Sequence, residues 1–97
     1  LPQQIIKVQT INQTGTGMMV SNVMQIEQRR AIIRARHRSF MDEGYQQVFV
    51  VDGADLFVSK LRHRMNGNTI ILKAYPRQNK YTQYCNGRTI IDRANIL

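Results

Sequence analysis

The sequence predicts a small α+β domain in which a mixed β-sheet packs with one long Arg-rich helix and a second, shorter helix. Three observations predict this class. A chain of 97 residues suffices for one domain. One long segment is rich in helix-forming residues, and several short segments are β-branched or alternate in polarity between turn residues. We expect residues 1–97 to form a single basic domain with the element order β-α-β-α-β-β-β.

The first half of the chain predicts one strand and the long helix. Gln4–Ile11 alternates in period two and is rich in β-branched residues, which indicates a strand. Residues 12–17, NQTGTG, form a turn-rich break. A helix then follows over Val23–Asp42, with Ser21 or Asn22 as its N-cap. It ends at Gly44, a residue that readily adopts the left-handed conformation of a helix stop.

The next two segments are expected to be a strand and the second helix. Tyr45–Val51 contains the apolar run VFVV and predicts a buried, central strand. Ala54–Met65 has two interpretations. As a helix it places its apolar residues on one face, whereas as a strand it pairs with the following segment through Asn66–Gly67. That hairpin register sets Lys60 opposite Lys73, which is unfavourable, so the sequence favours the helix.

Three strands are expected near the C-terminus. Thr69–Tyr75 is a strand closed by Pro76, and Lys80–Cys85 and Arg88–Asp92 flank the hairpin turn Asn86–Gly87.

The order of the elements also predicts how the strands pair. A βαβ unit from Val48 to Leu72 implies a right-handed crossover between parallel strands. The alternative architecture is one helix against an antiparallel β-meander.

The charge of the chain is strongly positive. Fourteen Lys and Arg residues face six Asp and Glu residues, so the formal charge is +8. The arginine fork matches phosphate groups, and a basic balance of this size usually implies a polyanionic partner, most often nucleic acid. The side chains expected to contact DNA or RNA are those of Arg29, Arg30, Arg34, Arg36, Arg38, Lys60, Arg62, Arg64, Lys73, Tyr75, Arg77, Lys80, Tyr81 and Arg88.

The Arg-rich helix is the centre of this expectation, although it is not cleanly amphipathic. Ile26, Ile33 and Phe40 recur at seven-residue spacing, and Arg29 and Arg36 fall on the same side. Nucleic-acid binding, largely independent of base sequence, is therefore the first hypothesis. The alternative is a structural or assembly subunit of a larger oligomer or nucleic-acid-containing particle, because arginines beside an apolar stripe suit an interface. The non-functional alternative is that the arginines of this helix form an ordinary solvent-exposed face.

Catalytic and metal-binding patterns are weak. Asp52 and Asp55, with Glu43 nearby in sequence, raise a third hypothesis of a small Mg²⁺-dependent nuclease, although helix capping explains the two aspartates better. His37 and His63 show no triad or zinc spacing. We therefore expect no enzyme activity, no metal and no cofactor.

The single cysteine, Cys85, excludes an intrachain disulfide framework. We expect a reducing intracellular compartment such as the cytoplasm, and no membrane partner, because the apolar runs are too short to span a bilayer.

Overall fold

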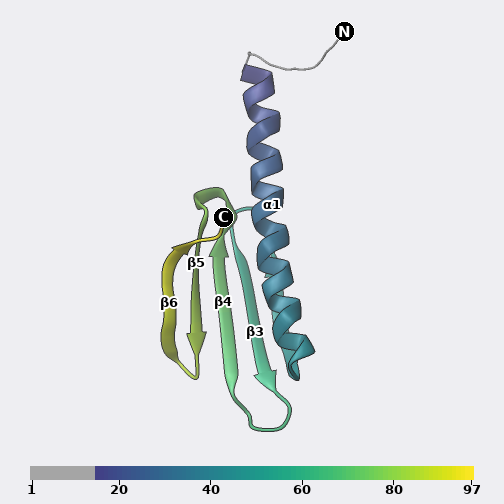
Figure 1. Ribbon diagram of the computed structural model, residues 1–97, viewed down its shortest axis with the longest axis vertical. Coiled ribbons are helices and arrows are strands. Elements are labelled where there is room, and N and C mark those ends of the chain that lie inside the picture. The colour runs from purple at the N-terminus through teal and green to yellow at the C-terminus, as the bar shows by residue number, and fades with distance from the viewer. Residues whose placement is uncertain (1–14) are drawn as a thin grey trace.

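A computed structural model describes the backbone of residues 15–97 and the side chains from residue 22 onward. Helix α1 precedes a five-stranded antiparallel sheet with the strand order β2-β3-β4-β5-β6 (Figure 1). The elements are α1 (Gly15–Asp42), β2 (Tyr45–Asp52), β3 (Phe57–His63), β4 (Thr69–Tyr75), the short 3₁₀ helix η1 (Pro76–Gln78), β5 (Lys80–Cys85) and β6 (Arg88–Asn95). The α+β class is confirmed, and the arrangement is the β-meander given as the alternative architecture. The predicted strand Gln4–Ile11 lies outside the described residues.

Helix α1 begins earlier than predicted. It starts at Gly15, so Ser21–Asn22 lies within the helix and does not cap it. The predicted end is confirmed, because Gly44 has φ +103 and its amide donates to the carbonyl of Met41. The helix packs against β2, β3 and η1, and its N-terminal part extends beyond the end of the sheet (Figure 1).

Strand β2 forms, but its predicted central, buried position is wrong. It pairs only with β3, at the edge of the sheet, and all of its residues after Tyr45 are exposed. An apolar run on both faces of a strand normally indicates cover on both sides. Here α1 crosses only one face, and no described strand pairs with the outer edge.

The predicted second helix over Ala54–Met65 is also wrong, because residues 57–63 form strand β3. Buried Phe57, Ser59 and Leu61 alternate with more exposed residues, which is the period of a strand. The loop after β3 is longer than a two-residue turn, so Lys60 pairs with Ile71 and not with Lys73. The repulsion that argued against a hairpin is thus removed by the register.

The antiparallel pairing of β2, β3 and β4 also excludes the predicted parallel βαβ unit from Val48 to Leu72 and the mixed sheet that it implied. The C-terminal predictions hold: β4 has the predicted bounds, and Asn86 and Gly87 have φ of +52 and +80, as a type I′ turn requires. Strand β6 continues past the predicted end at Asp92 to Asn95.

The core lies between α1 and the face of the sheet that it crosses. Its buried apolar side chains come from α1, β3, β4 and the C-terminus: Ile33, Phe57, Leu61, Ile70, Leu72, Ala74 and Ile96. Partners opposite each other on antiparallel strands point to the same side, so the register defines the second face of the sheet as well. No described helix packs on that second face, which we call the open face.

Candidate functional site

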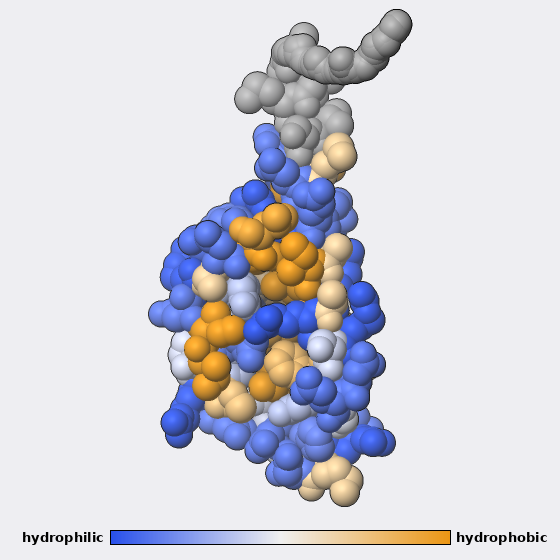
Figure 2. Space-filling view, viewed as in Figure 1, coloured by the Kyte–Doolittle hydropathy of each residue, from blue (hydrophilic) through white to orange (hydrophobic). Residues whose placement is uncertain are grey.

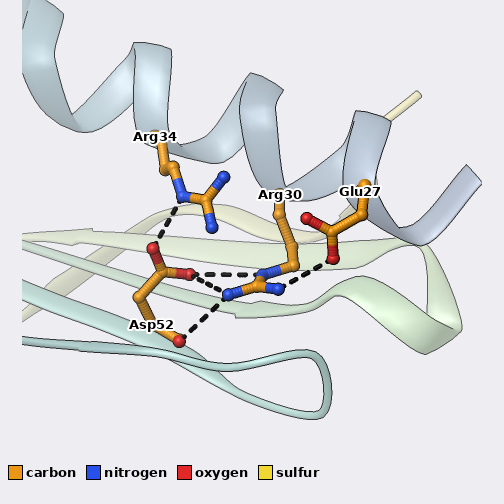
Figure 3. A network of polar contacts seen from close by, with 4 residues as sticks. All are labelled: Glu27, Arg30, Arg34 and Asp52. Carbon is orange, nitrogen blue, oxygen red and sulfur yellow. Dashed lines mark hydrogen bonds and ion pairs between the residues drawn. The ribbon is translucent and has the colours of Figure 1, made fainter. Parts of the chain in front are cut away.

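Two arginines of the predicted binding helix meet an acid of the sheet. Asp52, at the end of β2, accepts from Arg34 Nε at 2.6 Å and from Arg30 Nη2 at 3.1 Å (Figure 3). Arg30 also pairs with Glu27 at 2.8 Å, one turn earlier on the helix. Burial alone raises the pKa of Asp52, but the hydrogen bonds from Arg34 and Arg30 outweigh it and hold the pKa below its usual range. These two arginines therefore join α1 to β2.

Two more helix arginines point toward the sheet. Arg29 Nη1 donates to the carbonyl of Pro76 at 3.0 Å. Arg36 Nε donates to Gln83 Oε1 at 3.0 Å, and its guanidinium carbon lies 5.3 Å from the centre of the Tyr81 ring. Within the described residues, only Arg38 of the five helix arginines is exposed without a side-chain hydrogen bond. The five side chains thus do not converge on one exposed surface.

The predicted contact residues that lie outside α1 are divided between several surfaces. Lys60 and Arg62 lie on the open face, as do Lys73, Tyr75 and Lys80. Arg64 lies in the loop after β3, where its amide donates to the carbonyl of Gly44, and Tyr81 lies on the opposite face beside Arg36. Arg77, on η1, pairs with Asp55, while Arg88 is exposed at the hairpin between β5 and β6.

The open face gathers cations and aromatic rings. One row across the strands holds Phe49, Lys60, Ile71 and Tyr84, and Lys73 and the Tyr75–Lys80 pair lie on neighbouring rows. None of the residues that the strand pairing places on this face of β2–β5 is acidic. Phe49 is 47% exposed and was absent from the predicted site, because its strand was expected to be central and covered. The alternation of apolar or small residues with basic residues along β3 was the sequence signal that could have revealed this face.

The outer edge of β2 is a second candidate surface. Val48, Phe49, Val50 and Val51 are 48%, 47%, 37% and 51% exposed, although they are consecutive apolar residues. The strand carries no Lys, Arg or Pro, and its one acid, Asp52, is already paired. Figure 2 shows further apolar side chains beside α1 and over β6 on a largely hydrophilic face, in agreement with the exposure of Leu97 and Ile90.

The residues proposed for catalysis do not form a site in the described part of the chain. Asp52 and Asp55 are each engaged by arginine, and residues 22–97 contain no group of three His, Cys, Asp or Glu side chains placed to hold a metal. His37 contacts Ser59, but Ser59 is fully buried, so no substrate reaches its hydroxyl. Cys85 is a half-buried free thiol.

No protein-family model, no curated protein and no solved structure matches this chain. Over the described residues, no helix is both long enough and apolar enough to cross a membrane.

Proposed function

We propose that this protein is a structural subunit that assembles through the outer edge of β2. The observation that carries the proposal is the combination of a strand edge that no other described strand pairs with and four consecutive exposed apolar residues. An edge strand presents a row of backbone donors and acceptors that can pair with another chain. Exposed apolar side chains along that edge add the burial that such a contact needs.

The other edge of the sheet gives a comparison within the same molecule. Strand β6 carries Arg88, Asp92 and Arg93, its register shifts twice against β5, and Arg93 has φ +49. Charges and bulges of this kind are the usual protection of an edge against pairing. Strand β2 has a single bulge, between Gln47 and Phe49, and its residues 45–51 are all uncharged. The β6 edge is therefore protected against pairing with another chain and the β2 edge is not, as expected when β2 has a partner.

The length of α1 supports the same function. Its 28 residues span about 42 Å at the rise of an α-helix, whereas an eight-residue strand spans about 26 Å. In the part that extends past the sheet, Val23 and Met24 are each 59% exposed. Isolated helical segments are marginal in water and are normally stabilised by packing, so this part of α1 is a second surface suited to a neighbouring subunit.

The test is the mass of the full chain by multi-angle light scattering and sedimentation over a range of concentrations. We expect a dimer or larger species, and we expect Val48→Lys on β2 to reduce it to a monomer. Ile90→Lys on β6 is the matched control, since Ile90 is also exposed, at 58%. A monomer at every concentration, or equal loss of assembly in both variants, contradicts the proposal.

A second candidate function is polyanion binding on the open face. It is favoured by Lys60, Lys73 and Lys80 lying with Tyr75 and Tyr84 on a face whose registered positions on β2–β5 carry no acid. Cations that follow a phosphate backbone and rings that stack on unpaired bases are the common features of single-strand binding. The open face is a different surface from the Arg-rich helix, on which the sequence centred nucleic-acid binding.

Filter binding of a single-stranded oligonucleotide at several salt concentrations tests this second function. We expect the double variant Lys60→Gln, Lys73→Gln to reduce the slope of log affinity against log salt by about 1.4, from two lost phosphate contacts. The control removes the same charge elsewhere, as Arg64→Gln, Arg88→Gln. Equal slopes in the two double variants, or no binding at low salt, contradict a specific role for the open face.

A further inference from the structure

A surface pocket of about 340 Å³ lies where α1 passes η1. It is lined by Asn22, Gln25, Ile26 and Arg29 of α1 and by Arg77 of η1. Residues 22, 25 and 29 follow the spacing that places side chains on one side of a helix, so two amides and one guanidinium face the same space. Among the described residues, no acidic side chain lines the pocket.

Arg29 is fixed in this pocket with its charge uncompensated. Its Nη1 donates to the carbonyl of Pro76 at 3.0 Å, which holds the guanidinium against η1. Its Nε is buried and has no hydrogen-bond partner among the described residues. None of the ion pairs found within residues 22–97 involves Arg29. Arg29 as a whole is only partly buried, but a guanidinium with a buried, unpaired N–H and no described counter-ion favours an anion beside it.

Arg77 brings a second cation to the opposite wall. Its Nε donates to Asp55, and the side chains of the two residues are 58% and 82% exposed. An ion pair this exposed contributes little free energy. A guanidinium has five N–H donors, so the Nη groups of Arg77 remain able to bind a further acceptor.

The geometry points to a binding site for a tetrahedral oxyanion, a phosphate group, held between Arg29 and Arg77 with the side-chain amides of Asn22 and Gln25 as further donors. Two arginine forks match the oxygens of a phosphate group and give the short, charge-assisted hydrogen bonds that neutral amides alone do not. Because Arg29 is already held by Pro76, little conformational freedom is lost on binding. The group can come from inorganic phosphate or from a nucleic-acid backbone.

The test follows the side-chain Nε–Hε signals of the arginines in ¹H–¹⁵N spectra of the full chain. Sodium phosphate is titrated at constant ionic strength, with sodium acetate as the comparison. We expect saturable shifts of the Arg29 and Arg77 signals with phosphate and none with acetate. We expect Arg77→Gln to weaken phosphate binding at least tenfold. Arg88→Gln, which removes the same charge from an exposed hairpin away from the pocket, should change it less than twofold.

Shifts that do not saturate, or an equal weakening by Arg77→Gln and Arg88→Gln, overturn the site, because both results describe bulk charge. A second titration with a short single-stranded oligonucleotide distinguishes the sources. Saturable shifts of the same two signals at lower concentration identify a backbone phosphate, and shifts with inorganic phosphate alone identify the free ion. No β2 residue lines the pocket, so this test does not depend on assembly through the β2 edge.

Discussion

The imidazole Nδ1 of His37 on α1 lies 2.5 Å from the hydroxyl of Ser59 on β3, and both residues are buried. Ser59 is 0% and His37 9% exposed, and the edge of the His37 ring also meets Phe57 at a centroid distance of 6.3 Å. This polar contact lies inside the apolar layer that joins the helix to the sheet. The protonation of His37 is therefore coupled to the docking of α1.

We predict that stability falls as the pH drops below about 6.5, the ordinary pKa of histidine. Burial is the main cause that lowers the pKa of His37, with the charge of Arg38 acting in the same direction. The unfolded chain then binds more protons than the folded one in this window, so the free energy of unfolding rises with pH and is lost as the pH falls.

Urea unfolding between pH 7.5 and 5 measures this effect. The variant His37→Gln should be less stable at pH 7.5 but should lose much of the slope in that window. A wild-type stability that stays constant between pH 7.5 and 5 would refute the coupling.

The pairing of Asp52 with Arg30 and Arg34 predicts a second, more acidic transition. The lowered pKa of Asp52 means that its contribution is present above the ordinary carboxylate pKa of about 4 and is lost as the pH falls through the folded-state value. Because the side chains are partly exposed, Asp52→Asn should cost only about 1 kcal/mol at neutral pH. Asp92→Asn, an exposed carboxylate outside the described ion pairs, is the control. Equal effects of the two variants in chemical denaturation would contradict a structural role for the Asp52 pairs.

Local signals in the sequence were sufficient for much of the fold. The end of α1 at Gly44 and the turn at Asn86–Gly87 depend on backbone conformations that few residues adopt, and both were predicted. Strand β3 was missed because its apolar residues fit a helical face and the hairpin was given too short a loop. The alternation of Phe57, Ser59 and Leu61 was present, but a longer loop was needed to make the pairing favourable.

The candidate site was harder to predict than the fold. Sequence spacing correctly placed Arg29 and Arg36 beside Ile33, but it could not show that Asp52 would lie opposite Arg30 and Arg34. That contact joins residues 18 and 22 positions apart, and it depends on how α1 turns back over β2. The edge position of β2 was also inaccessible, since an apolar run predicts burial without showing which strand lacks a neighbour.

Truncation of the core side chain Leu61 should be strongly destabilising. Leu61 is 0% exposed and lies between the helix and the centre of the sheet. We expect Leu61→Ala to cost about 2–5 kcal/mol, the sum of lost burial and a residual cavity. Met65→Ala, at a residue that is 85% exposed, should change stability by less than about 0.5 kcal/mol. Thermal and urea unfolding check both values, and a similar small loss in the two variants would show that this core is not packed as described.

Two glycines with positive φ allow a matched comparison of backbone strain and steric contact. Gly87 has φ +80, and a Cβ added there meets no atom within 4 Å, so Gly87→Ala should cost about 1 kcal/mol through strain alone. Gly44 has φ +103, and a Cβ there would lie 2.8 Å from His63 Nε2. His63 Nε2 also lies 3.0 Å from the carbonyl oxygen of Glu43. Gly44→Ala must therefore both strain the backbone and displace a ring that packs on Tyr45, so it should cost more than Gly87→Ala. Denaturant midpoints of the two variants measure the difference, and the reverse order would contradict the tight connection between α1 and β2.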